Sequence, residues 1–186
     1  AGDAMTGANK NVAVGKDAAG ATTIGAQNVA IGHSSLSTNT NGDKATAVGT
    51  DALLNQNPSS AGNTFNVAVG HSAGKAITTG TLNNLVGALA GDALTTGSEN
   101  VVMGHAALST EDTGRKNVAI GYSALNAQNA DVDNYNVAVG YNAGLSVTTG
   151  TDNTLIGAEA GDALTTGSLN VALGKKSLTA DTKGNR

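Results

Sequence analysis

A short apolar run between an asparagine and a glycine recurs along the chain. The copy at 136–140 reads Asn-Val-Ala-Val-Gly. Ten such runs close on a glycine, and these glycines are Gly15, Gly32, Gly49, Gly70, Gly87, Gly104, Gly121, Gly140, Gly157 and Gly174. Their successive separations are 17, 17, 21, 17, 17, 17, 19, 17 and 17 residues. Self-similarity at one fixed period predicts a solenoid of ten 17-residue coils with two insertions.

Each run has the composition of a short β-strand that ends at a residue tolerant of positive φ. A second extended stretch, such as 143–149, precedes a second glycine that stands ten residues after the first in eight of the units. Two strands and two turns per unit predict one coil of an all-β, parallel β-solenoid, with neighbouring coils about 4.8 Å apart. We expect residues 1–186 to form a single repeat array, a fragment of a longer fibre.

An asparagine stands four residues before the closing glycine in nine of the ten units, and Ala45 is the exception. Stacked amides can bond to one another along such a column, which gives the asparagines a structural role without catalysis. The predicted ladder comprises Asn11, Asn28, Asn66, Asn83, Asn100, Asn117, Asn136, Asn153 and Asn170.

The strand pattern is apolar on both faces. Val137 and Val139 point to one side and Ala138 to the other, because side chains alternate along a strand. A strand with one solvated face would alternate apolar with polar residues, so both faces are expected to be covered. One face can be the coil interior, and we assign Ala138 to the other face, where it would contact a second copy of the same chain.

A longer repeat also exists, because residues 66–108 realign with 136–178 at an offset of 70. The two insertions, at 53–65 and 125–135, occupy matching places and are therefore expected on one side of the solenoid. Insertions on one face of a solenoid are often its binding surface.

Composition narrows the function classes. The net charge is −4 and the basic residues are scattered, so no nucleic-acid partner is expected. No apolar run approaches the length needed to span a bilayer, and no membrane insertion by this segment is expected. No nucleophile, histidine and acid stand at catalytic spacing, and no phosphate-binding loop is present. We therefore expect no enzymatic activity and no cofactor.

The candidate contact residues are the few rings of the chain. Five directly follow a closing glycine, namely His33, His71, His105, Tyr122 and Tyr141, and two end the insertions, Phe65 and Tyr135. They suit contact with a receptor, including a glycan, although a solvated turn position also accepts such residues. The histidines lie on alternate coils, about 10 Å apart, so one metal ion cannot bridge them within a chain. The aspartates suit turns better than a calcium site, and no metal is expected.

A threonine column stands eight residues after the closing glycine, at Thr23, Thr40, Thr78, Thr95, Thr148, Thr165 and Thr182. A regular threonine column on a flat face would suit an ice-binding β-solenoid, which stays open as an alternative.

Runs such as Asn28-Val29-Ala30-Ile31-Gly32, followed by Ser35, resemble the repeats of YadA-like heads in trimeric autotransporter adhesins. The Thr148-Thr149-Gly150 turn and the longer coil are more similar to the version found in bacteriophage tail fibres. The resemblance implies a left-handed β-roll, a homotrimer and a role in host-receptor binding and adhesion. It implies location in the virion, with the surface-exposed head of a bacterial adhesin as the alternative.

Overall fold

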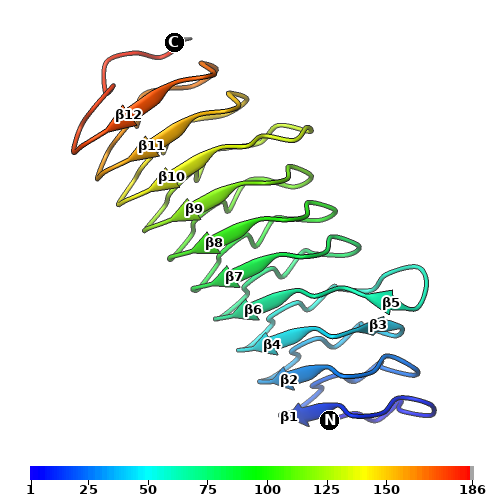
Figure 1. The fold of residues 1–186 in the computed structure, drawn as a ribbon. Coiled ribbons are helices and arrows are strands. Elements are labelled where there is room, and N and C mark those ends of the chain that lie inside the picture. Colours follow the sequence, from blue (N-terminus) through cyan, green and yellow to red (C-terminus); the bar gives the residue numbers. More distant parts are fainter. Residues whose placement is uncertain (185–186) are drawn as a thin grey trace.

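The computed structural model describes residues 1–184 and shows a parallel β-solenoid of ten coils (Figure 1). The last two residues of the predicted array, 185–186, lie outside the described residues. One three-residue strand per coil builds a ten-stranded sheet in the order β1-β2-β4-β6-β7-β8-β9-β10-β11-β12. The strands are β1 (Val12–Val14), β2 (Val29–Ile31), β4 (Thr46–Val48), β6 (Val67–Val69), β7 (Asn84–Val86), β8 (Val101–Met103), β9 (Val118–Ile120), β10 (Val137–Val139), β11 (Thr154–Ile156) and β12 (Val171–Leu173). The predicted all-β solenoid is confirmed.

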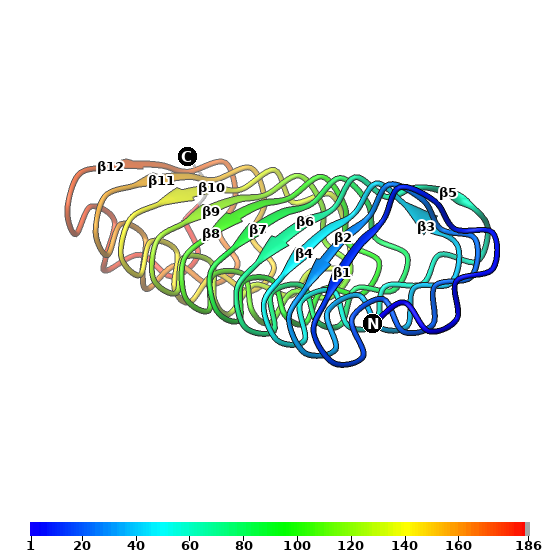
Figure 2. The same cartoon turned by 90° about the horizontal axis from the view of Figure 1, so that it is seen from below.

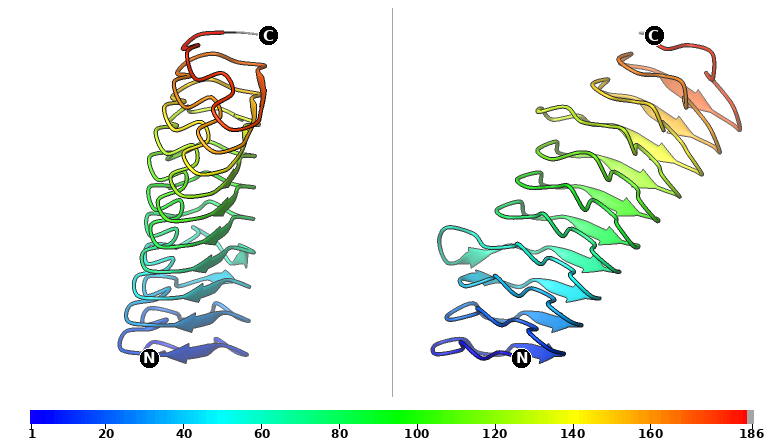
Figure 3. Two further views of the ribbon diagram at one scale, coloured as in Figure 1. Left: turned by 90° about the vertical axis from the view of Figure 1, so that its left-hand side faces the viewer. Right: turned by 180° about the vertical axis from the view of Figure 1, so that it is seen from behind.

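Every pair of neighbouring strands is parallel and in register, so equivalent residues of successive coils lie directly above one another. Ala138, for example, pairs with Ala119 on one side and with Leu155 on the other. The views from below and from the sides show the coils stacked one on the next along the whole chain (Figures 2 and 3). No helix occurs among residues 1–184, and thus none that could cross a membrane.

The prediction of a second strand at 143–149 is wrong. This stretch is a series of turns, because Asn142 and Gly144 adopt positive φ values of 53° and 61°. Alternate amides bond to the next coil, as Gly144 N does to Ala160 O at 2.9 Å, whereas Val147 N closes a turn on Gly144 O at 3.1 Å. The stretch therefore belongs to the stacked backbone without the extended conformation of a strand.

The two insertions rejoin the solenoid in the same way. The first pairs β3 (Gly42–Asp43) with β5 (Gly62–Asn63) in a small parallel sheet that lies apart from the main sheet (Figure 1). At the second insertion a parallel bridge joins Arg115 to Asp133 in the equivalent register.

The assignment of Ala138 to an interface between chains is wrong. Ala138 is fully buried within its own coil, whereas Val137 and Val139 point outward and are half-buried. The same pattern holds along the sheet, where the middle residue of β2, β4 and of each strand from β6 to β12 is buried. An alanine is large enough at this inward position because the larger side chains that fill the coil interior come from the opposite wall.

The core follows an exchange rule between two positions of that opposite wall, four and seven residues after the closing glycine. In some coils a leucine is followed by a polar residue, as in Leu36/Asn39, Leu53/Gln56, Leu108/Glu111 and Leu125/Gln128. In four coils a glycine is followed by an aliphatic residue, namely Gly74/Ile77, Gly91/Leu94, Gly144/Val147 and Gly161/Leu164, and the first coil departs from both patterns with Ala19 and Thr22.

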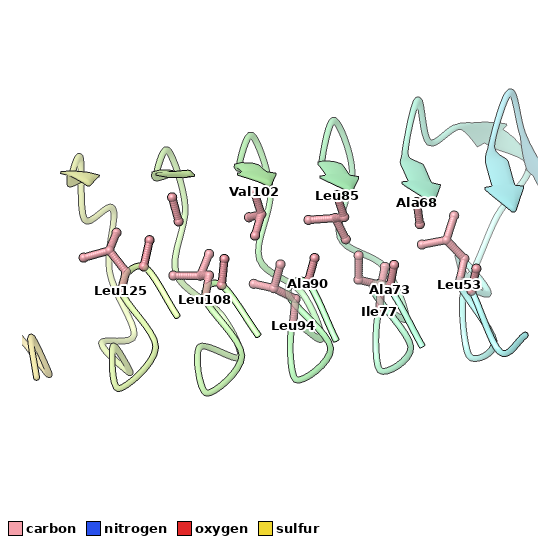
Figure 4. Packing of buried hydrophobic residues seen from close by; sticks show 14 of the residues in the cluster. Leu53, Ala68, Ala73, Ile77, Leu85, Ala90, Leu94, Val102, Leu108 and Leu125 are labelled. Atoms are coloured by element: carbon pink, nitrogen blue, oxygen red, sulfur yellow. The ribbon is translucent and has the colours of Figure 1, made fainter. Parts of the chain in front are cut away.

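The two positions compete for the same space inside the coil. An added Cβ on Gly74 would lie 2.6 Å from Leu85 Cδ1 and 3.1 Å from Ile77 Cδ1. Figure 4 shows the resulting stack, in which Leu85 and Val102 extend from the strands toward the opposite wall, Leu85 toward Ile77 and Val102 toward Leu94. One or two large aliphatic side chains per coil thus fill a core that is too narrow for more.

The asparagine column closes each coil and links it to the next. Asn83 donates its amide Nδ2 to Gly97 O of its own coil at 2.8 Å, and its Oδ1 accepts the backbone N–H of Asn100 at 3.1 Å. The amide-to-amide bond of the expected ladder is also present here, from Asn100 Nδ2 to Asn83 Oδ1 at 3.1 Å. These amides are buried, so each bond satisfies a polar group that would cost free energy if it were buried without a partner.

Ala45 replaces an asparagine in the coil that carries the first insertion. That coil lacks the glycine whose carbonyl an asparagine would bond. Asn66 of the next coil keeps the regular bond to Gly80 O at 2.7 Å and also donates to Gln56 Oε1 at 2.8 Å, where other coils offer the amide oxygen of a preceding asparagine. In the second inserted coil Asn117 remains, and Asn134 Oδ1 accepts its Nδ2 at 3.1 Å. Side-chain carbonyls of the inserted coils thus take the place of a missing asparagine amide at Ala45 and of a missing backbone carbonyl at Asn117.

Candidate functional site

The outward residues of the ten-stranded sheet form a continuous apolar surface, here called the aliphatic face. It consists of the first and third residue of each strand, which are aliphatic or Met except for Thr46, Asn84 and Thr154. Its side chains remain substantially exposed in the middle of the chain, with Val101 at 39% and Met103 at 49%. The single chain therefore leaves one side of every strand uncovered.

A glycine ends each strand because two coils approach closely there. Gly140 has a φ of 143°, and an added Cβ would lie 2.5 Å from Gly157 O of the next coil. The following residue is held in a backbone ladder, since Tyr141 O accepts the N–H of Glu159 at 2.7 Å. The residue after the glycine thus recurs at a fixed height in every coil.

These ten positions form what is here called the ring column. In order they are Lys16, His33, Thr50, His71, Ala88, His105, Tyr122, Tyr141, Ala158 and Lys175. Three successive rings stack face to face: His105 lies 5.3 Å from Tyr122 with planes 9° apart, and Tyr122 lies 5.5 Å from Tyr141 with planes 16° apart. Both tyrosines are half exposed, so their edges face solvent.

His33 and His71 belong to the same column but stand apart from the three-ring stack, with Thr50 and Ala88 between the histidines. Among residues 1–184 no group of three or more His, Cys, Asp or Glu side chains is placed to hold a metal ion. The described residues also enclose no pocket. Recognition by this chain would therefore use an exposed surface.

The two aromatic residues of the insertions lie elsewhere, at the position directly before the asparagine. Phe65 and Tyr135 both adopt positive φ, at 51° and 53°. In each case a lysine of the preceding coil covers the ring, with Lys44 Nζ 5.2 Å from the Phe65 centroid and Lys116 Nζ 4.9 Å from the Tyr135 centroid. The predicted contact residues therefore form two separate groups, and these two rings are partly occupied by cation–π contacts.

Tyr135 is also part of a charged cluster at the second insertion. Lys116 Nζ lies 2.6 Å from Asp133 Oδ2 and donates to the Tyr135 hydroxyl at 2.9 Å. The hydrogen bond from Lys116 lowers the pKa of the Asp133 carboxyl, and the bond to Asp133 raises the pKa of Lys116. The cluster ties the inserted loop to the preceding coil.

The threonine column is engaged in the solenoid itself. Hydroxyls of Thr23, Thr78, Thr95, Thr148 and Thr165 each donate to a backbone carbonyl of the next coil. These hydroxyl protons are not available to order water on a flat face.

Sequence reasoning did not single out one feature of the acidic residues. Asp92 and Asp162, which are equivalent under the 70-residue offset, each bury an oxygen, Oδ1, that has no hydrogen-bond partner. Burial raises the pKa of Asp92, against the lowering effects of its backbone hydrogen bond and of the charges of Lys75 and His105. Both aspartates lie in a coil whose ring-column residue is alanine, a coincidence visible in the sequence alignment of the repeats.

Comparison with models of known families, with curated proteins and with solved structures finds no match to this chain.

Proposed function

We propose that this chain is a non-enzymatic structural and adhesive segment of a homotrimeric surface fibre, a bacteriophage tail fibre that takes part in binding a host receptor. The observation that carries this proposal is the aliphatic face. Ten strands spaced about 4.8 Å apart and three residues long outline an area of roughly 480 Å². An area of this size is comparable to the largest apolar patch of a typical monomer, which is often functional.

A second copy of the chain is the simplest partner for a face that runs the whole length of a repeat array. Closed symmetry lets identical faces cover one another, and three chains around an axis would each turn this narrow strip toward the other two. The low charged fraction of 13% is consistent with a chain that places part of its surface against other chains. A fibre built this way displays its ring column and insertions repeatedly along its length.

Analytical ultracentrifugation of the segment tests the assembly. We expect a trimer, and we expect Val139→Lys to weaken association by at least ~100-fold, because it places an ammonium group in an apolar interface. Thr50→Lys is the matched control, since lysine already occupies the ring column at Lys16 and Lys175. A folded wild-type monomer at tens of micromolar would refute the proposal.

A further inference from the structure

The ring column contains a gap of defined width at Ala88. Leu89 N donates to His71 O and Ala106 N donates to Ala88 O, both at 3.0 Å, so the backbone carries 71, 88 and 105 at the same position of three successive coils. Imidazole rings stand at both ends of this interval, and only a methyl group lies between them. Two coil spacings give about 9.6 Å between the two ring positions.

The neighbouring stack shows how the column behaves when each coil carries a ring. There the rings are parallel and one coil apart, at 5.3 Å and 5.5 Å between centroids. The interval at Ala88 is equivalent to this stack with its middle ring removed. It therefore leaves, between two coils that carry imidazoles, one position of the column where a further ring can enter from solvent.

The width selects the kind of ring. Carbon atoms in contact lie about 3.5–4.0 Å apart, so a flat aromatic ring between two others would leave roughly 2 Å unfilled in an interval of about 9.6 Å. A puckered pyranose ring with axial hydrogens on both faces is thicker and would touch both imidazoles. We propose that the slot formed by His71, Ala88 and His105 binds a pyranose whose ring substituents are equatorial, with the sugar ring sandwiched between the two imidazoles.

The polar surroundings fit the rim of such a sugar. Equatorial hydroxyls project from the edge of the ring, where a hydrogen-bond acceptor is required. Asp92 belongs to the same coil as Ala88, interacts electrostatically with His105 and keeps Oδ1 without a partner. Asp92 thus places a carboxylate close to one ring of the slot, although its Oδ1 is buried.

The equivalent interval 70 residues later supplies an internal comparison. There Ala158 lies between Tyr141 and Lys175, and Asp162 repeats the unpartnered Oδ1 of Asp92. This interval has a ring on one side only, so a sugar would stack on one face. The slot at Ala88 is therefore the stronger site of the two.

The slot deepens the proposed adhesive function and rests on it for its biological meaning, because it makes the receptor a glycan. Saturation-transfer NMR on the whole segment tests it, with methyl β-glucopyranoside, methyl β-galactopyranoside and 4-methylphenol as probes. We expect transfer to the axial protons on both faces of the glucoside. The galactoside should show less transfer, because its axial 4-hydroxyl obstructs one face.

Substitution at one residue supplies the matched pair of variants. Ala88→Tyr should abolish the two-faced transfer by filling the slot, and it should fold, since Tyr122 and Tyr141 occupy the same column. Ala88→Ser should retain it. Absence of transfer to the glucoside in wild type, equal transfer in Ala88→Tyr, or stronger transfer to 4-methylphenol would each overturn the proposal.

Repeating the titration with Val139→Lys separates this inference from the assembly. Two-faced transfer retained in the dissociated variant would show that the slot does not depend on assembly, and the same transfer to a wild-type protein that sediments as a monomer would support the slot while refuting the trimer. A trimer without transfer would refute the slot alone.

Discussion

The exchange rule in the core predicts that one coil can be given the interior of another. The coil that contains Leu85, Gly91 and Leu94 would take the composition of the coil with Ala30, Leu36 and Asn39 through Leu85→Ala, Gly91→Leu and Leu94→Asn. The regular turn is retained, so the new amide can bond Gly97 as Asn39 bonds Gly42, whose N–H donates to Asn39 Oδ1 at 2.9 Å. We expect the triple variant to fold with nearly the stability of wild type.

The single changes should behave very differently. Leu85 and Leu94 are fully buried, so truncating either one costs about 2–5 kcal/mol in transfer and cavity terms. Gly91→Leu alone would place its Cβ 2.8 Å from Leu94 Cδ1 and 3.1 Å from Leu85 Cδ2. Such overpacking costs about 1–3 kcal/mol. If the sites were independent, the three costs would add to roughly 5–13 kcal/mol.

In the triple variant the new leucine fills the space that the other two vacate, and the remaining cost is about 1–2 kcal/mol for a leucine at positive φ. Leu108 already adopts this conformation, with a φ of 49°. Urea unfolding followed by circular dichroism measures the four variants against wild type. A triple variant as unstable as the sum of the single changes would refute the idea that the positions share one space.

Three further outcomes follow from contacts described above. Ala138→Asp should unfold the segment at neutral pH whether or not the chains associate, because it buries a carboxylate inside the coil, and a folded variant by circular dichroism would contradict the inward orientation. Because Lys116 lowers the pKa of Asp133 from 3.8, their bond stabilises the second insertion above that pH and is lost as the pH falls through the lower folded-state pKa. As the pH falls through that folded-state pKa, amide exchange in 126–135 should accelerate in the wild-type protein. The Asp133→Asn variant should show no such pH-dependent change. Gln56→Leu leaves the buried Asn66 amide without one acceptor and should cost about 1–3 kcal/mol in urea unfolding, whereas an unchanged midpoint would show that this bond is dispensable.

The period, the number of coils and the parallel register could be predicted from the sequence, because each closing glycine and its neighbours repeat at a fixed spacing. The direction in which the Ala138 side chain points could not be predicted. Its strand is apolar on both sides, so the hydrophobic pattern does not distinguish inside from outside. That choice depends on side chains such as Leu125, which share the interior of the solenoid but come from the opposite wall of a coil.

The turns at 143–149 escaped prediction for a different reason. Left-handed backbone is uncommon for residues other than glycine, yet Asn142, Leu108 and Leu125 all adopt it. Stacking between coils enforces this conformation, and composition alone does not reveal it. For the candidate site, the shared position of His105, Tyr122 and Tyr141 was visible in the repeats, whereas the parallel stacking of their rings required coordinates.

The alternation in the core also bears on how long such a chain can be. A layer with Leu53 and Gln56 is followed by one with Gly74 and Ile77, and a layer with Leu125 and Gln128 is followed by one with Gly144 and Val147. Removing residues 66–135 would therefore place each remaining layer beside a neighbour of the kind it already has. Duplicating the same block would do likewise, so the solenoid can lengthen or shorten in four-coil steps of about 19 Å without creating a new kind of core contact.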